Sequence, residues 1–335
     1  MAHYFESGFT VRTPSWHRLE TVLDEHPDNW DDARMAAGLM WEPRMVPLFR
    51  RDVDAEGNEV YVEAEGAKLV ERDDNARPLG VVSDTFELLS HAQMGEIAEA
   101  IVGAGNVRYE TAGSVREGRT VYSLLLLDEP YEIKGDVDSF GDPVLTLPYL
   151  ALLNSHDGTG ACKVLYTQVR VVCANTVQAA DADGDRHGAQ FSFRHTTGLA
   201  GRVEEAKDAL KLARVEALRW KSVAEELHAI TISDEQQLIF LNEFMPEPPS
   251  GLASDRVRAN VARDRQQFMT ILNDSLTNCE IAHTGLGLVN AAVEYLDHVR
   301  GFRTSDTYMG RQLLRPEPLK AKAVALVREL ATASN

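Results

Sequence analysis

The sequence predicts an α+β fold, in which an antiparallel sheet core is flanked by helices and followed by a mainly helical C-terminal part. Two observations predict this fold. Before residue 172, short stretches of alternating polar and apolar residues are joined by polar turns, which is typical of hairpins. After residue 202, apolar residues recur every three or four positions, which is typical of helices. We therefore expect a β-rich α+β core over residues 1–200 and a helical region over 201–335 that packs on this core or on a neighbouring subunit.

The first part of the chain contains short strands and few helices. The expected strands cover residues 45–49, 59–63, 68–71, 79–82, 107–111, 120–127, 144–153 and 162–172. A short helix is expected over residues 30–40, and a longer one over 91–102, where apolar residues recur at helical spacing and glycines follow. A further short helix over 173–182 is expected to cap the sheet. Strands and helices do not alternate along the chain, so the sheet is expected to be antiparallel.

Five helices are expected in the C-terminal part. They cover residues 202–228, 233–244, 255–275, 286–298 and 319–331. Ser233 is a suitable N-cap for the second of them. The first carries a seam of apolar residues at alternating three- and four-residue spacing: Val203, Ala206, Leu210, Ala213, Ala217, Trp220, Ala224 and Leu227. The seam fits packing within the chain, and it also fits self-association, because small alanines let another helix approach closely.

The composition bounds the class of protein. The chain has 335 residues and a net charge of −18, from 52 acidic and 34 basic residues. This charge argues against a uniformly basic surface for nucleic acid, although it leaves room for a local basic groove. No apolar run reaches the roughly 18 residues of a membrane-spanning helix, the N-terminus lacks the layout of a signal peptide, and the cysteines form no disulfide framework. A protein of a reducing cytoplasm without membrane contact is therefore expected.

Sequence motifs for metals and nucleotides are missing. No His-Glu-x-x-His pair occurs, and the aspartates at 181, 183 and 185 lack the downstream glutamate of a calcium loop. The glycine pairs at 158 and 160 and at 285 and 287 lack the lysine of a phosphate-binding loop. No cofactor and no metal ion are therefore expected, and a nucleotide-hydrolysing enzyme is not expected.

The most distinctive polar segment is the connection NSHDGTG over residues 154–160. Asn154, Ser155, His156 and Asp157 fit a binding or catalytic hairpin tip. They also fit an ordinary turn, in which His156 and Asp157 bond to the local backbone. A catalytic triad does not follow from these neighbours, because adjacent side chains on a strand point apart and triads are assembled in space.

A locally positive segment follows this connection. Over residues 158–201 the only acidic residues are three aspartates. The basic residues of the segment and its flank are Lys163, Arg170, Arg186, Arg194 and Arg202. Together with Asn175 they suit contacts to phosphate groups, although an ordinary sheet with scattered basic residues has the same pattern. A C-terminal basic region that includes Arg300, Lys320 and Lys322 fits a solvated face or a binding surface.

Seven stretches occur in a characteristic order. They are LGVVSDTFELL (residues 79–89), YETAGS (109–114), LLNSHDGT (152–159), VRVVCANT (169–176), RHT (194–196), GLGLVNAAVEYLDH (285–298) and residues 309–323. In this order they resemble the phage/plasmid-like protein family built on domain of unknown function 932. The resemblance implies a phage, prophage or plasmid setting, but no particular activity. The expected order of helix, hairpin, two more strands and helix is also similar to the core of phage single-strand annealing proteins of the Red-beta, Erf and RecT types, which oligomerise and hold one DNA strand along a basic groove.

The first hypothesis is therefore an oligomeric, non-enzymatic protein that binds single-stranded DNA and promotes strand annealing in recombination. Its expected DNA-binding residues are Lys163, Arg170, Arg186, Arg194, Arg202, Asn154, His156 and Asn175, and Tyr149, Tyr166 or Phe193 are expected to stack on bases. The alternative is an acidic interaction protein that antagonises a factor of the host or of a rival element, since an acidic surface imitates nucleic acid. A third hypothesis is an enzyme centred on residues 154–157.

Overall fold

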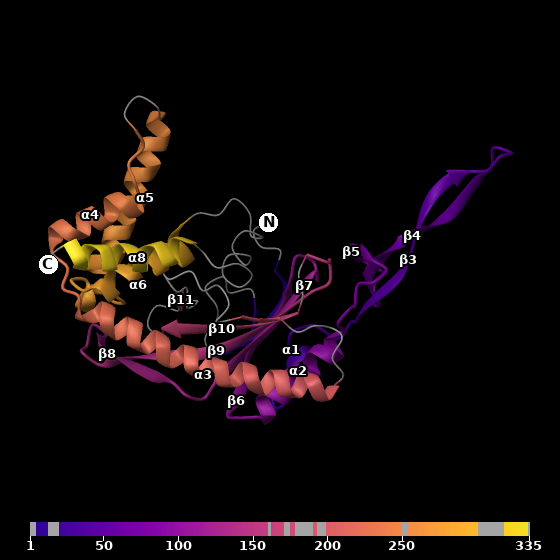
Figure 1. The fold of residues 1–335 in the computed structure, drawn as a ribbon, viewed down its shortest axis with the longest axis horizontal. Coiled ribbons are helices and arrows are strands. Elements are labelled where there is room, and N and C mark those ends of the chain that lie inside the picture. The colour runs from indigo at the N-terminus through magenta and orange to yellow at the C-terminus, as the bar shows by residue number, and fades with distance from the viewer. Residues whose placement is uncertain are drawn as a thin grey trace. The chain divides into compact units, whose positions relative to one another are not determined.

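The computed structural model describes residues 5–12, 20–159, 162–170, 175–177, 190–192, 199–249, 253–300 and 318–333, with the backbone alone at 169–170, 175–177, 190–192 and 199–207. The predicted α+β class is confirmed, with antiparallel strands in the first part of the chain and helices in the C-terminal part (Figure 1). The chain forms two compact units. The first unit contains residues 1–127, 150–165 and 190–211, and the second unit contains residues 128–149, 166–189 and 212–335.

The two units differ from the expected division at residue 200 because two long strands contribute to both. β9 (Pro143–Ser155) and β10 (Lys163–Arg170) each give one part to each unit. β8 (Tyr131–Val137), which was not predicted, pairs with the beginning of β9 and belongs to the helical second unit. α3 (Leu199–Ala229) begins in the first unit and continues in the second.

The first unit is organised around a sheet with the strand order β10-β9-β7-β6-β1-β2. Its other strands are β1 (Phe5–Val11), β2 (Thr21–Leu23), β6 (Val107–Val115), β7 (Thr120–Leu127) and β12 (Gln190–Ser192), which pairs with β10. β6 and β7 form the predicted antiparallel hairpin, while β1 and β2 are parallel. Seven of the eight residues of β7 are buried, so both of its faces are covered, and this explains its nearly continuous apolar sequence.

Two helices of the first unit contact β6. They are α1 (Trp30–Ala36) and α2 (His91–Gly103). α2 begins with a capping box between Ser90 and Gln93, and its predicted apolar face is buried. A Cβ atom on Gly95 would lie 2.1 Å from Cδ1 of Trp30, so this glycine allows the indole to pack directly on the α2 backbone.

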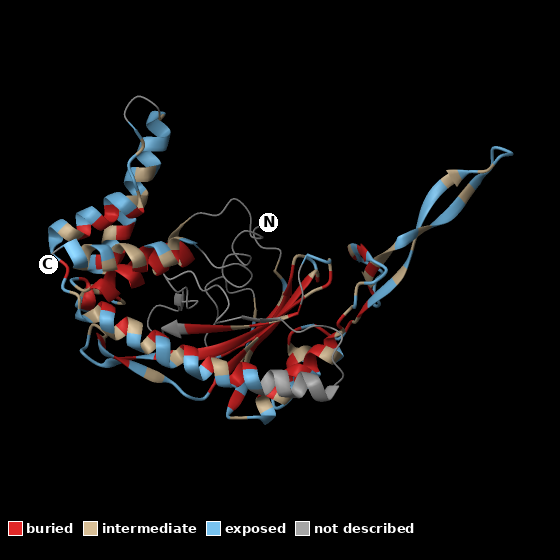
Figure 2. Ribbon diagram, in the orientation of Figure 1, coloured by how far each residue is buried: buried red, intermediate tan, exposed pale blue. Residues whose placement is uncertain are grey.

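A three-stranded antiparallel sheet completes the first unit. Its strands are β3 (Pro43–Val53), β4 (Glu59–Arg72) and β5 (Pro78–Ser83). The two strands predicted over residues 59–63 and 68–71 are therefore one strand. β5 pairs only with residues 67–71 of β4, and the rest of β3 and β4 continues as a two-stranded ribbon with exposed Phe49, Val53 and Tyr61 (Figure 2). Such a ribbon buries little apolar surface.

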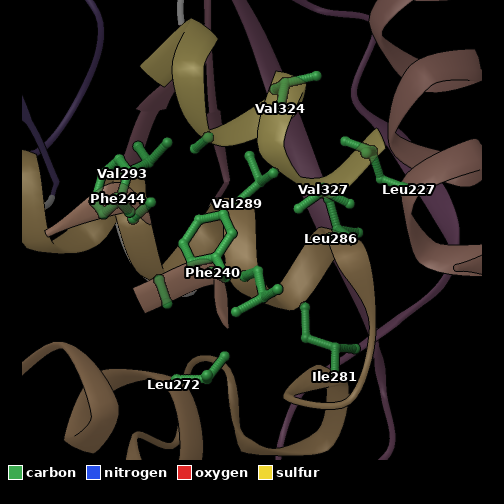
Figure 3. Packing of buried hydrophobic residues seen from close by; sticks show 14 of the residues in the cluster. Leu227, Phe240, Phe244, Leu272, Ile281, Leu286, Val289, Val293, Val324 and Val327 are labelled. Atoms are coloured by element: carbon green, nitrogen blue, oxygen red, sulfur yellow. The ribbon is translucent and has the colours of Figure 1, made fainter. Parts of the chain in front are cut away.

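The helices of the second unit enclose a hydrophobic core. They are α4 (Asp234–Phe244), α5 (Asp255–Asp274), the 3₁₀ turn η1 (Cys279–Ile281), α6 (Gly285–Glu294), the π-helix η2 (Tyr295–Val299) and α8 (Pro318–Ala333). Phe240 stacks on Phe244 and on Phe268 of α5, with ring centroids 5.4 and 5.9 Å apart. Figure 3 shows Phe240, Val289 and Val327 converging in this core from α4, α6 and α8. Within the described part of the chain, every helix is too short or too polar to span a lipid bilayer.

The structure corrects two of the expected helices. Residues 175–177, expected as part of a helix, form the short strand β11 (Asn175–Val177), which pairs with the end of β10. The ladder gives backbone partners to a segment in which Thr176 and Val177 are β-branched and favour strands. The helix expected over residues 286–298 is α-helical only as far as Glu294, and η2 continues it with wider turns.

Five of the eight seam residues of α3 are buried by the chain itself, Ala217 is half-buried, and the side chains of Val203 and Ala206 lie outside the described ones. Ala213, Ala224 and Leu227 are 0% exposed, and Trp220 is 6% exposed. Trp220, Ala224 and Leu227 belong to the hydrophobic core of the second unit. These positions therefore favour packing within the chain over self-association.

Ala213→Glu should lower the free energy of unfolding by about 3 kcal/mol, because it places a carboxylate where no solvent reaches it. Leu218→Glu is the matched control, since Leu218 is 70% exposed on the same helix, and it should stay within about 0.5 kcal/mol of the parent. Chemical denaturation followed by circular dichroism measures both. An Ala213→Glu variant with the stability of the parent and a smaller solution mass would instead make the seam an interface between subunits.

Candidate functional site

The connection between β9 and β10 begins with a turn that is held by its own side chains. The Asp157 carboxylate accepts hydrogen bonds from the Ser155 hydroxyl at 2.6 Å and from the backbone N–H and hydroxyl of Thr159 at 3.0 and 2.5 Å. Nη1 of Arg116 lies 3.2 Å from the same carboxylate. Burial raises the pKa of Asp157, but these hydrogen bonds and Arg116 together lower it more, so this pKa lies below its usual value. Asp157 is thus an ionised centre of the turn.

His156 points away from this turn into the first unit and is 0% exposed. Its Nδ1 lies 2.9 Å from the carbonyl oxygen of Gly118, and its Nε2 lies 3.1 Å from Nδ2 of Asn154. A carbonyl oxygen only accepts, so Nδ1 donates to Gly118 and Nε2 accepts from the Asn154 amide. Asn154 also donates to the Leu89 carbonyl at 2.9 Å, and burial lowers the pKa of His156 to about 4. The neutral imidazole therefore ties this turn to the β6–β7 turn.

A second buried imidazole and an indole complete a group that we call the histidine cluster: His91, His156, Trp41 and Asn154. The centroids of the two imidazole rings are 5.2 Å apart. Trp41 meets His91 and His156 edge-on, at centroid distances of 4.3 and 5.8 Å. Burial, and then the neighbouring His156, lower the pKa of His91 to about 3. The guanidinium of Arg72 lies 4.1 Å from the Trp41 ring, so a cation covers the indole beside two neutral imidazoles.

Four side chains that were expected to contact DNA are buried, two of them as DNA-binding residues and two as stacking residues. Asn154 and His156 are 1% and 0% exposed, so their side chains offer no atom to DNA in this structure. Tyr149 and Tyr166 are 6% and 3% exposed. The Tyr166 hydroxyl donates to Gln168 at 2.9 Å, which satisfies its polar end inside the second unit. These four side chains therefore belong to the interior of the protein.

The turn does not form a catalytic triad. The Ser155 hydroxyl bonds to Asp157, whereas the His156 ring bonds to Gly118 and Asn154, so the imidazole is not the base for this serine. Among the described residues, no group of three or more His, Cys, Asp and Glu side chains is arranged to hold a metal ion.

The other expected DNA-binding residues fall on β10, β11 and α3. Lys163 is half-buried at the start of β10, and Arg170 at its end stands directly opposite Asn175 of β11. Positions 163 and 170 have opposite parity, so a regular strand puts them on different faces of the sheet, and one face does not hold both. Arg202 lies in the first turn of α3. Outside the described residues lie Arg186, Phe193 and Arg194.

The cluster residues Trp41, Arg72 and His91 were not singled out from the sequence. Trp41 stands just before β3, Arg72 ends β4 and His91 begins α2. These three positions form no recognisable sequence motif, and only the folded chain brings them together. Arg72 is anchored there by ion pairs with Glu6 and Asp74.

An acidic depression of about 470 Å³ lies elsewhere in the first unit, and it was also missed. Its lining residues are Leu23, Asp24, Glu25, His26, Pro27 and Asp32. The sequence signal was present, since five acidic residues occur between positions 24 and 32. All five are exposed, so this surface repels phosphate and suits a basic partner.

One comparison with known proteins identifies the family of the chain. A family model described as a domain of unknown function (DUF932) matches residues 78–315. This match covers well over half of the chain, including the turn after β9 and α3 to α6, so the chain belongs to this family and the resemblance found in the sequence is confirmed. No curated protein matches the chain, and no solved structure matches it.

Proposed function

We propose that this member of the DUF932 family is an oligomeric, non-enzymatic protein of a phage or plasmid that binds single-stranded DNA in the bacterial cytoplasm and promotes strand annealing. The observation that carries the proposal is the pairing of Arg170 with Asn175 across the β10–β11 hairpin. Residues directly opposite in an antiparallel ladder share one face. An arginine and an asparagine are thus neighbours, and their guanidinium and amide groups are suited to a phosphate backbone.

The order of elements also supports the proposal. α2 is followed by the β6–β7 hairpin, by β9 and β10, and then by α3, which is the order expected from the similarity to annealing proteins, with β8, β11 and β12 as additions. Oligomerisation would use a surface other than the buried part of the α3 seam.

Arg170→Gln should weaken binding to an oligothymidylate at every salt concentration and flatten the plot of log affinity against log salt by about 0.7 to 1 unit, because one phosphate contact is lost. Asn175→Asp should weaken binding further, since a carboxylate then faces the phosphates. Arg77→Gln is the charge-matched control, because Arg77 is exposed in the turn between β4 and β5. Fluorescence anisotropy at several salt concentrations, with the solution mass measured with and without the oligonucleotide, checks these expectations. If Arg170→Gln and Arg77→Gln both bind like the parent, Arg170 is not a phosphate contact.

A second candidate function is an acidic interaction protein that occupies a basic factor of the host or of a rival element. The acidic depression favours it, because three of the five exposed acidic residues between positions 24 and 32 line it. The same titration separates the candidates: a chain with no affinity for single-stranded DNA at low salt is not an annealing protein, and the second candidate then replaces the first.

A further inference from the structure

The N-terminal half of α5 is a solvent-exposed helix. Figure 1 shows this half extending beyond α4 and α8, and Figure 2 shows that it is largely exposed. Its C-terminal half is anchored by the buried side chains of Phe268, Ile271 and Leu272. Ser254 caps the N-terminus of the helix through the Val257 N–H. The exposed half is therefore a rigid continuation of an anchored helix.

Four exposed polar residues form one stripe along this half, which we call the α5 stripe: Arg256, Asn260, Arg263 and Gln267. They are spaced by four, three and four residues, which places them above one another on one helical face. No acidic residue occurs from position 256 to position 263, although the chain contains 52 acidic residues. Asp264 directly follows this run and lies beside Arg263: burial and Asp264 raise the pKa of Tyr295 to about 12, and Arg300 and Arg263 act in the opposite direction.

The arginines of α5 differ in how many hydrogen bonds and ion pairs they form within the protein. Arg265 donates to the carbonyls of Leu241 and Met245 at 3.3 and 2.6 Å, so it fastens α5 to α4. Arg258 pairs with Asp255 at 2.6 Å, away from the stripe. Arg256 forms no ion pair with any described residue, and the Arg263 guanidinium lies 3.6 Å from an Asp264 oxygen, which is a weak exposed pair. The stripe thus presents two guanidinium groups to a ligand with negative charge.

We propose that the α5 stripe binds double-stranded DNA. The stripe is about 17 Å long, the length of about five base pairs, and an α-helix fits the width of the major groove. Arginine contacts phosphates and guanine, and asparagine and glutamine contact adenine, so the stripe contains the side chains that read this groove. It contains no aromatic side chain, and single strands are held largely by aromatic stacking, so a duplex is the ligand that fits. This inference uses other residues and another form of DNA than the proposed function, and it stands or falls separately.

The test compares the Arg256→Gln/Arg263→Gln double variant of the full chain with Arg258→Gln, using a short mixed-sequence duplex and an oligothymidylate as probes. The double variant should lose about 10- to 100-fold in affinity for the duplex at about 0.1 M salt and flatten its salt slope by about two units. Its affinity for the oligothymidylate should not change. Arg258→Gln removes a charge two residues away on another face, so its duplex affinity should stay within about twofold of the parent. Circular dichroism checks that all variants keep the helical content of the parent.

Three results would overturn the proposal. The first is a parent chain without affinity for the duplex, which would leave the stripe as a surface for a protein. The second is a double variant that binds the duplex like the parent. The third is an equal loss in the double variant and in Arg258→Gln, which would show a general effect of charge. A failure to bind oligothymidylate, in contrast, overturns only the annealing function.

Discussion

Lowering the pH from about 7 to about 5 should reduce the free energy of unfolding of the first unit by about 4 kcal/mol, because two buried imidazoles gain protons when it unfolds. The pKa values of His91 and His156 are lowered to about 3 and about 4, mainly by burial. In the unfolded chain both pKa values return to about 6.5, so the unfolded state binds more protons below that pH. This contribution to stability is fully present above about pH 6.5 and is lost progressively as the pH falls toward the two folded values.

Urea denaturation followed by tryptophan fluorescence measures this loss, since Trp41 contacts both imidazoles. Between about pH 6 and pH 5, the free energy of unfolding of the parent falls with pH. His91→Gln and His156→Gln should each make this fall less steep by about 1.4 kcal/mol per pH unit. His283→Gln is the control, because the His283 side chain is 63% exposed, and it should keep the slope of the parent. An identical slope in the parent and both cluster variants would show that the imidazoles take up protons without unfolding. The structure argues against that result, because Nε2 of His91 has no hydrogen-bond partner among the described residues.

Lys320→Met should destabilise the second unit by about 4 kcal/mol, because it removes a buried lysine that pairs with a buried carboxylate. Nζ of Lys320 lies 2.8 and 2.9 Å from the two carboxylate oxygens of Asp297, and the side chains are 7% and 3% exposed. The sequence predicts Lys320 on a solvated face or a binding surface, and this prediction is wrong because its side chain is buried. Urea denaturation followed by circular dichroism at helical wavelengths measures the effect.

The double variant Asp297→Leu/Lys320→Met separates the ion pair from the packing around it. It should recover most of the lost stability, because it removes the buried carboxylate together with its lysine partner. Lys322→Met, an exposed lysine on the same helix, is the matched control and should cost less than about 1 kcal/mol. A Lys320→Met variant as stable as the parent, with no difference from the double variant, would mean that water reaches Asp297.

The sequence predicts helices well where periodicity and capping agree. α2 and α4 occur where the spacing of apolar residues places them, and the predicted N-cap Ser233 forms a capping box with Gln236. β8 was missed because Glu132, Lys134 and Asp136 give it the composition of a loop, and only its pairing with β9 makes it a strand. β11 was expected as a helix for a related reason: three residues carry too little periodicity to outweigh a tertiary partner.

The candidate site was predictable only in its local part. The turn interpretation of residues 154–160 is confirmed for Asp157, which bonds to the backbone of Thr159, but not for His156, which bonds to the distant Gly118. The inward direction of His156 depends on Trp41 and His91, which come from other elements, and local patterns do not contain that information. Side-chain burial on β9 and β10 likewise depends on which faces the fold covers, so exposed basic residues and stacking aromatics are not distinguishable from buried ones in the sequence.

The interleaving of the two units constrains how the chain folds as it leaves the ribosome. Residues 128–149 emerge before the segments 150–165 and 190–211 that complete the first unit, yet they belong with helices that follow residue 212. Ile133 of β8 is buried in the same core as Val324 and Val327 of α8, nearly two hundred residues later. Contacts between segments so distant cost loop-closure entropy and form late. β8 and the beginning of β9 therefore lack part of their core until the residues of α8 have been synthesised, and during that interval an unpaired strand edge is open to wrong partners or to a chaperone.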